Sequence, residues 1–253
     1  MIDTHSHILP YMDDGPMTIQ EAVQMAEAAW KEGIRSIIAT PHHADGKHIN
    51  EREKICFAVA EINNHLSRLN LDIQVVPGQE IRMNRDLLTD LKSGNLVMLN
   101  EGNYILLELP HDSIPSYTHE MIHELRLLHL EPIIAHPERN LEIIKSPAKF
   151  SELIELGAIG QVTTQSLSGH YGKKAKETAL YLCKSNLIHL IATDAHDLRY
   201  RPPFIQQALH LISGKVGPDF TKMLLQNAEF VLNHGPVIKR EPELKRRWYL
   251  PFR

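Results

Sequence analysis

The stretch MIDTHSH (residues 1–7) decides the expected fold, because a short apolar segment runs directly into two histidines one residue apart. Side chains two residues apart on a strand point to the same side. If this stretch is extended, the imidazoles of His5 and His7 face one way at the end of the strand. Two imidazoles placed in this way can ligate one metal ion.

Short β-branched runs alternate with amphipathic helical stretches along the whole chain. Thr18 and Glu21 have the spacing of a capping box at the start of the first helix. We expect strands at 1–4, 34–40, 72–78, 104–110, 131–137, 158–163 and 187–193. We expect helices at 18–33, 51–69, 85–92, 115–130, 147–156, 173–185, 202–213 and 219–233. This alternation predicts a parallel α/β sheet in one domain, which could be a barrel or an open doubly wound sheet.

Composition excludes several classes of protein. The 253 residues are 43% hydrophobic, enough for a large core, and the net charge of -4 gives no global basic field for nucleic acid. Two cysteines, Cys56 and Cys183, cannot form a disulfide framework. We see no secretory leader and no apolar run near the ~18 residues of a membrane span. We therefore expect a cytoplasmic protein that does not insert into membranes.

Motifs for covalent phosphatases and nucleotide binding are missing. A cysteine phosphatase needs a cysteine followed six positions later by an arginine. Neither Cys56 nor Cys183 has one, because Ile62 and His189 occupy those positions. The sequence also has no Gly-Lys-Ser/Thr phosphate loop and no Gly-x-Ser-x-Gly elbow.

Polar residues instead collect just after the expected strands, where parallel α/β folds build their active sites. These residues are His5, His7, Asp13, Asp14, His42, His43, Glu80, Glu108, His136, Asp194 and His196. Counting only one of His42 and His43 and one of Asp13 and Asp14, five histidines and four carboxylates exceed the ligands of one ion, so we expect a polynuclear site with a bridging carboxylate. Such sites suit phosphoester hydrolysis. Arg139 and Arg201 could bind phosphate oxygens. His42 and His43 are adjacent in an extended segment, so we expect only one of them to be a ligand.

The segments DTHSH, TPHH, GQE, LELP, AHPER and TDAH resemble the metal-binding motifs of the PHP (polymerase and histidinol phosphatase) superfamily. HILPYMDDGP, AHPERN and DAHDLRYRPP resemble most closely the bacterial protein-tyrosine phosphatases of capsule and exopolysaccharide operons, the YwqE/CpsB type. The resemblance covers almost the whole chain to about residue 233. It implies a distorted TIM-like barrel of seven β/α units over residues 1–234, followed by a C-terminal tail at 235–253.

The resemblance also implies three divalent metal ions, usually manganese in this branch, with zinc or iron as alternatives. One ion would be bound by His5, His7, Glu80 and Asp194. A second would share Glu80 and add His42 and His136. A third would take Asp14, Glu108 and His196. The match to DDGP favours Asp14 over Asp13, which would then be a cap or a hydrogen-bond acceptor behind the ligands.

The implied substrate is phosphotyrosine on the tail of a bacterial tyrosine autokinase that controls polysaccharide assembly. A metal-bound hydroxide would attack phosphorus in line, without a phosphoenzyme. Arg139 and Arg201 would hold the equatorial oxygens, and Asp14 or a metal-bound water could donate the proton to the leaving group.

Other functions remain open. Histidinol phosphate or another small phosphomonoester would use the same site, and a regulatory module could bind the kinase tail without turnover. A nucleic-acid phosphodiesterase is disfavoured by the acidic balance, and an amidohydrolase by Glu108 where that fold commonly has lysine. The oligomeric state, a role of Arg199 in phosphate binding and the role of the basic-aromatic tail also stay open.

Overall fold

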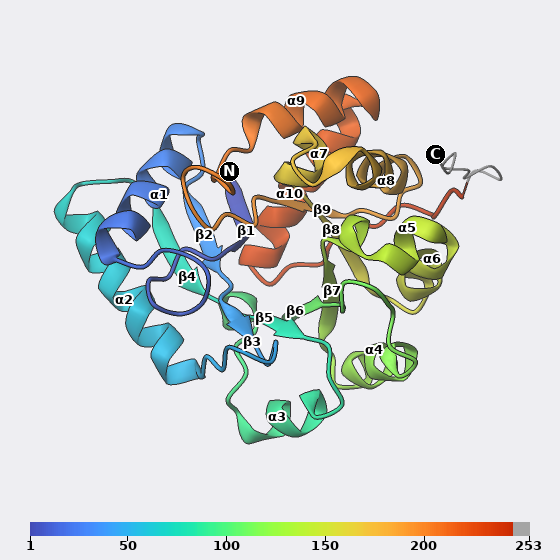
Figure 1. Ribbon diagram of the computed structural model, residues 1–253, viewed down its shortest axis with the longest axis horizontal. Coiled ribbons are helices and arrows are strands. Elements are labelled where there is room, and N and C mark those ends of the chain that lie inside the picture. The colour runs from blue at the N-terminus through green and yellow to red at the C-terminus, as the bar shows by residue number, and fades with distance from the viewer. Residues whose placement is uncertain (245–253) are drawn as a thin grey trace.

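Short strands paired in parallel occupy the centre of the molecule, and helices surround them (Figure 1). The computed structural model describes residues 1–244. One sheet has the order β1-β2-β4 and the other β3-β5-β6-β7-β8-β9. The strands are β1 (Ile2–Ser6), β2 (Ser36–Ala39), β3 (His42–His43), β4 (Gln74–Pro77), β5 (Glu80–Arg82), β6 (Tyr104–Glu108), β7 (Glu131–Ala135), β8 (Ile159–Thr163) and β9 (Leu190–Ala192).

The two sheets join into one ring. Strand β2 continues into β3 across Pro41, and β4 continues into β5 across Gly78, so the strands occupy seven positions. Proline cannot donate a ladder hydrogen bond. A Cβ on Gly78 would lie 2.9 Å from Ile38 Cγ2. The missing N–H donor at Pro41 and the close contact at Gly78 therefore interrupt the hydrogen-bond ladder.

The last strand closes onto the first. Ser6 bridges to Ala195 in parallel, His7 N donates to Ala195 O at 2.8 Å, and Asp194 N donates to His5 O at 2.8 Å. The prediction of a distorted barrel with seven β/α positions is confirmed, and the open sheet is excluded.

The longer helices lie around this ring. They are α1 (Ile19–Lys31), α2 (Arg52–Arg68), α3 (Leu87–Ser93), α4 (Thr118–Leu127), α6 (Pro147–Glu155), α8 (Gly172–Lys184), α9 (Gln206–Lys215) and α10 (Pro218–Leu232). Shorter helical turns are η1 (Leu99–Glu101), η2 (Pro137–Arg139), α5 (Leu141–Lys145) and α7 (Thr164–Ser168).

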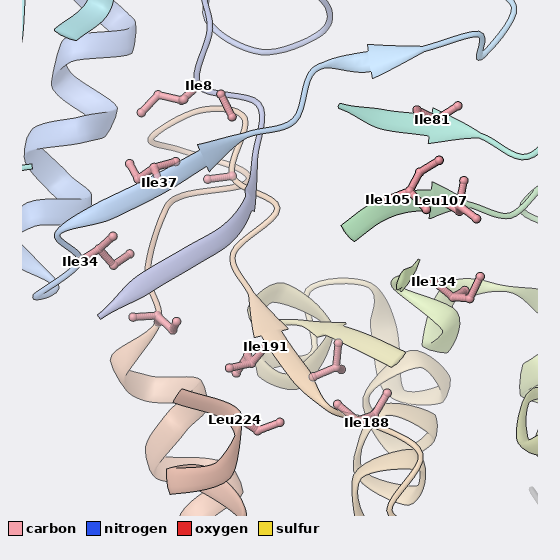
Figure 2. Close-up of a cluster of buried hydrophobic side chains, with 14 of the residues drawn as sticks. Ile8, Ile34, Ile37, Ile81, Ile105, Leu107, Ile134, Ile188, Ile191 and Leu224 are labelled. Atoms are coloured by element: carbon pink, nitrogen blue, oxygen red, sulfur yellow. The ribbon is translucent and has the colours of Figure 1, made fainter. Parts of the chain in front are cut away.

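Alternation along the strands divides the core into two hydrophobic clusters. Ile105 and Leu107 of β6 belong to the larger one, together with Ile134 and Ile191 (Figure 2). Their neighbour Leu106 belongs to the smaller cluster, with Ile133, Ile159 and Leu190 of the adjacent strands and Val231 of α10. One side of each strand therefore packs against the helices and the other fills the barrel. Glu108, two residues after Leu106, takes the inward position at the strand end.

The expected strands and long helices all occur, shifted by a few residues at their ends. Glu21 N donates to Thr18 Oγ1 at 3.2 Å, which confirms the cap at the start of α1. The sequence did not predict β3, β5, α5 or α7, because elements of two to five residues have no measurable periodicity. Neither Cys56 nor Cys183 is in a disulfide.

The described part of the tail packs against the barrel. Ile238 N donates to Asn227 Oδ1 at 2.8 Å, and Lys239 Nζ donates to Gly157 O at 2.8 Å. The basic-aromatic residues at 245–249 lie outside the described residues. Within residues 1–244 no helix combines the length and the apolar character that crossing a bilayer requires.

Gly160 lies in β8 where the neighbouring chain comes very close. A Cβ at this position would lie 2.2 Å from Leu187 O and 3.1 Å from Phe150 Cζ.

We predict that Gly160→Ala lowers the free energy of unfolding by about 1–3 kcal/mol, the usual cost of overpacking. Gly214→Ala is the matched control, since Gly214 is an exposed residue of α9 with open space around it. Alanine there should stabilise the helix by up to about 1 kcal/mol. Urea unfolding of both variants checks this; equal midpoints would contradict it.

His189 is a buried histidine on the other side of the same contact. Its Nδ1 accepts from Gly160 N at 3.1 Å, and its Nε2 has no partner among the described residues. Burial, with a smaller contribution from the charge of Lys239, lowers the pKa of His189 to about 3.

This shift makes stability depend on pH in a defined direction. Below about pH 6.5 the unfolded chain binds a proton at His189 that the folded chain does not bind, so stability falls as pH falls from about 6.5 towards 3. We predict that His189→Asn, which keeps an acceptor for Gly160 N, removes this loss. The stability of the wild type relative to the variant should fall by about 2 kcal/mol between pH 6.5 and 5. The control is His210→Asn on exposed α9. A parallel pH dependence in all three proteins would refute the assignment.

Candidate active site

The strand ends bring the predicted ligands together at one end of the barrel. Three overlapping groups have ligand atoms within 4.8 Å of one another. They are His7, Asp14, His42 and His196; His5, His7 and Glu80; and His42, Glu80 and Glu108.

The carboxylate of Glu80 lies at the centre of these groups. Its Oε2 atom is 2.9 Å from His42 Nδ1 and 3.3 Å from His7 Nε2. The same atom is 3.5 Å from His5 Nε2, and Oε1 is 2.8 Å from His136 Nε2. The two oxygens therefore face imidazoles on both sides, as a bridging ligand would.

Asp194 lies beside the group of His5, His7 and Glu80. Its Oδ1 lies 3.2 Å from His5 Nε2 and 3.4 Å from His7 Nε2, and these two nitrogens are 3.2 Å apart. The expectation that His5 and His7 face one way therefore agrees with the geometry.

Two of the candidate ligands have left-handed backbone conformations. His136, directly after β7, has φ 34°, and Asp194, after β9, has φ 53°. Such values are uncommon outside glycine and cluster at functional sites. Here they turn the two side chains inwards at the ends of their strands.

Asp13 and Asp14 have different environments. Asp13 Oδ2 accepts from His7 Nδ1 at 2.6 Å and from the backbone N of His42 at 2.9 Å, so Asp13 fixes the ring of a candidate ligand from behind. Asp14 Oδ1 instead lies 3.3 Å from His196 Nε2. The geometry supports Asp14 as the ligand and Asp13 as its hydrogen-bonding neighbour.

The grouping differs from the expected sets at two residues. Glu108 lies beside Glu80, with Oε1 3.9 Å from His136 Nε2. His42 Nε2 lies 3.6 Å from Asp14 Oδ1, and His42 groups with His196. Glu108 therefore groups with Glu80 rather than with Asp14 and His196. His42 lies between the two sets, with Nδ1 facing Glu80 and Nε2 facing Asp14. His43 turns away, with Nδ1 3.0 Å from Asn50 O, as expected for the second of two adjacent residues on a strand.

Several residues that support the site were not predicted. Arg82 Nη2 contacts Glu108 Oε2 at 2.9 Å, and Gln161 Oε1 lies 2.8 Å from His5 Nδ1. Arg82 follows Glu80 by two residues and therefore shares its face of β5, a signal that the sequence did contain.

The two predicted arginines occupy different positions. Arg139 Nη2 lies 2.6 Å from Asp194 Oδ2 and donates to Thr163 Oγ1 at 2.7 Å, and its guanidinium lies 3.9 Å from the centre of the Tyr171 ring. Arg201 Nη2 donates to Asp14 Oδ2 at 2.7 Å. Both therefore contact candidate ligands directly.

Metal ligation needs carboxylates and neutral imidazoles. Burial opposes the change, but the surrounding carboxylates raise the pKa of His5, His7 and His42, so a metal ion would have to displace protons from these rings. Burial opposes the change, but His5 and His42 hold the pKa of Glu80 well below its usual range. Burial and the charge of Glu80 raise the pKa of Glu108. Burial, and next the charge of His7, lowers the pKa of His196 to about 4. Cations between these groups would offset the repulsion between the two glutamates.

Three of the candidate ligand atoms lack the hydrogen bonds that buried polar atoms usually have, as expected at a metal site. His42 Nδ1, Glu80 Oε2 and His196 Nε2 are buried, and no hydrogen bond satisfies them among the described residues. Orphaned buried polar atoms are costly unless something else binds them. Imidazole nitrogens and carboxylate oxygens facing each other without hydrogen bonds are what a divalent ion requires.

A cavity of about 530 Å³ opens beside this cluster. Its lining includes the charged or polar residues Glu108, His136, Arg139 and Arg201. It also includes the apolar residues Leu109, Pro110, Leu141, Ile144 and Ala175. A phosphoryl group and an attached apolar ring would therefore find complementary walls.

Comparisons with known proteins show the family of the chain. Residues 1–233 match the family described as capsular polysaccharide synthesis, CpsB/CapC. The chain is 41% identical over 253 residues to the tyrosine-protein phosphatase YwqE of Bacillus subtilis (strain 168), with 100% of both chains covered. It is 30% identical to the tyrosine-protein phosphatase CpsB of Streptococcus agalactiae serotype III (strain NEM316), covering 92% of this chain and 99% of that one.

Solved structures give the same result. A chain from the crystal structures of YwqE from Bacillus subtilis and CpsB from Streptococcus pneumoniae, described as unique metal-dependent tyrosine phosphatases, matches with a TM-score of 0.94 at 40% identity. The match covers 98% of this chain and 100% of that one. A phosphotriesterase homology protein from Escherichia coli shares the fold alone, with a TM-score of 0.56 at 11% identity over 91% of this chain and 98% of that one. The chain therefore belongs to the CpsB/CapC family of capsular polysaccharide synthesis.

Proposed function

We propose that this chain is a metal-dependent tyrosine-protein phosphatase that hydrolyses phosphotyrosine on a tyrosine kinase of capsule or exopolysaccharide synthesis, in the cytoplasm. Family membership supports the reaction. The observation that carries the proposal is the position of Glu80, whose two oxygens face four imidazoles beside a cavity lined by arginines and apolar side chains.

We further propose three manganese ions. His5, His7, Glu80 and Asp194 would hold one, Glu80, Glu108 and His136 a second, and Asp14, His42 and His196 a third. Oxygen and imidazole donors without thiolate suit manganese, although zinc and iron accept the same ligands. When bound, such ions supply a water nucleophile of lowered pKa and positive charge for the phosphoryl oxygens.

The remaining chemistry falls to the side chains of the chain itself. Arg201 lines the cavity and can bind a phosphoryl oxygen while still paired with Asp14. Arg139 orients Asp194 and presents its guanidinium to the same cavity. Burial opposes the change, but His196 and Arg201 hold the pKa of Asp14 below its usual range. We therefore assign Asp14 to metal ligation rather than to proton donation. Tyrosine has a pKa near ~10 and leaves with little help from an acid.

The apolar lining of the cavity supports a tyrosyl substrate. Leu141 and Tyr171 are partly exposed at this cavity, so a side chain presented by another protein can reach it. We propose residues 1–234 as the catalytic unit and 235–253 as an appended tail.

We predict that chelated protein releases phosphate from a tyrosine-phosphorylated peptide only after manganese is added. Glu80→Gln should lower this rate by about 1,000-fold, because several kcal/mol of charge stabilisation are lost. Glu61→Gln, on the exposed side of α2, is the control and should keep full activity. Histidinol phosphate is assayed in parallel. Faster release from histidinol phosphate would overturn the substrate, and binding without release from either would favour a regulatory module.

We predict that Asp13→Asn weakens manganese binding by about 10- to 100-fold, the usual effect of losing the partner that orients a ligating histidine. An amide cannot accept from His7 Nδ1, His42 N and Gly15 N at once, as the carboxylate does. Calorimetric titration of the chelated variant measures the affinity. Asp72→Asn, whose side chain is 94% exposed, is the control. Unchanged affinity in Asp13→Asn would argue against this orienting role.

A further inference from the structure

A second cavity of about 220 Å³ lies next to the one that would hold the scissile phosphotyrosine. Ser168, His170, Arg199, Tyr200 and Phe204 are among the residues that line it. They come from α7 and the turn after it, and from the loop between β9 and α9. Helices α7 and α9 lie side by side (Figure 1).

Neighbouring residues of the same two segments line both cavities. Tyr171 and Arg201 line the first, whereas His170 and Arg199 line the second. The His170 and Tyr171 rings meet edge to face at 5.1 Å. A bound peptide could therefore place one side chain in each cavity.

The second cavity is cationic and aromatic. No carboxylate lines it, although the chain has a net charge of -4. Arg199 has no ion-pair partner within residues 1–244. The Arg199 guanidinium lies 4.9 Å from the centre of the Tyr200 ring. Tyr200 is 59% exposed and Phe204 is 50% exposed, so both rings remain accessible to a ligand.

The loop is held in a shape that presents these groups outwards. A carboxylate of the same loop, that of Asp197, uses Oδ1 to accept from the backbone N of Arg199 at 2.6 Å and of Tyr200. The backbone N of His196 donates to Arg201 O at 2.9 Å. Asp197 therefore stabilises the turn rather than pairing with the Arg199 guanidinium.

We propose that this second cavity binds a second phosphotyrosine of the same peptide, with Arg199 and His170 contacting the phosphate and Phe204 and Tyr200 contacting the ring. The second cavity would thus add to the affinity for a peptide that presents a second phosphotyrosine beside the scissile one. This inference rests on the proposed phosphatase function. Side chains two residues apart in an extended peptide point to the same side, which suits two adjacent cavities on one face.

The test uses peptides that carry one phosphotyrosine and a variable residue two positions to either side. The variable residue is phenylalanine, glutamate or phosphonomethylphenylalanine, which keeps the charge and ring but cannot be hydrolysed. We expect the phosphono peptide to have a kcat/KM about 5- to 20-fold above that of the phenylalanine peptide, through KM, as one partly exposed charged contact provides. Glutamate, which lacks the ring, should give an intermediate gain.

Substitutions test whether the higher kcat/KM of the phosphono peptide depends on this cavity. Arg199→Gln should abolish that increase and leave hydrolysis of p-nitrophenyl phosphate unchanged. Phe204→Ala should reduce the increase. Arg68→Gln removes the same charge from exposed α2 and should keep the full gain. Equal kcat/KM for the phosphono and phenylalanine peptides in the wild type, or a gain that survives in Arg199→Gln, would overturn the proposal. An equal gain from glutamate would overturn its aromatic part.

Fluorescence anisotropy of the same labelled peptides separates this proposal from the proposed function. A protein that hydrolyses no substrate contradicts the phosphatase function. Tighter binding of the phosphono peptide, lost in Arg199→Gln, would still support the second cavity in that case, and equal binding would exclude it.

Discussion

The rest of the structure depends on one buried carboxylate, that of Glu80, and on the imidazoles around it. Burying an ionised carboxylate costs several kcal/mol unless opposite charges or ligands surround it. His5, His7, His42 and His136 come from three other strand positions. The ring must therefore close for Glu80 to be satisfied. The contact between β1 and β9 closes the ring, and the ladder is interrupted at Pro41 and Gly78. The left-handed conformations of His136 and Asp194 turn their side chains inwards at the strand ends.

Much of this could be predicted from spacing. The alternation of strands and helices and the polar residues at strand ends predicted a parallel fold with one functional face, and the capping box at Thr18 was correct. The pair His5 and His7 faced one way because strand geometry has a period of two.

Other features depend on contacts between distant segments, which spacing does not encode. Closure of the ring needs the β9–β1 contact, 189 residues apart in sequence. The grouping of His42 with both Glu80 and Asp14, and of Glu108 with Glu80, depends on how separate strand ends and the Asp14 loop meet in the fold. Nothing in the sequence marks Gln161 as a site residue, because only the position of β8 in the fold places it next to His5. Arg82 could have been found from its spacing to Glu80.

The surroundings of the site connect phosphate chemistry to a protein substrate. A cavity lined by arginines and by aliphatic side chains has the chemistry that the proposed aryl phosphate requires. The loop closed by Asp197 extends the same surface towards Arg199 and the exposed aromatic rings. Selectivity would thus come from loops beyond the barrel, whereas the reaction depends on the strand ends.

The most direct test of this account is an anomalous-diffraction map of crystals of the protein loaded with manganese. The account predicts separate manganese peaks at the carboxyl ends of the strands, with Glu80 contacting two of them and Asp14, His42 and His196 surrounding another. A single peak not bridged by Glu80, or no peak among these side chains at saturating manganese, would contradict it.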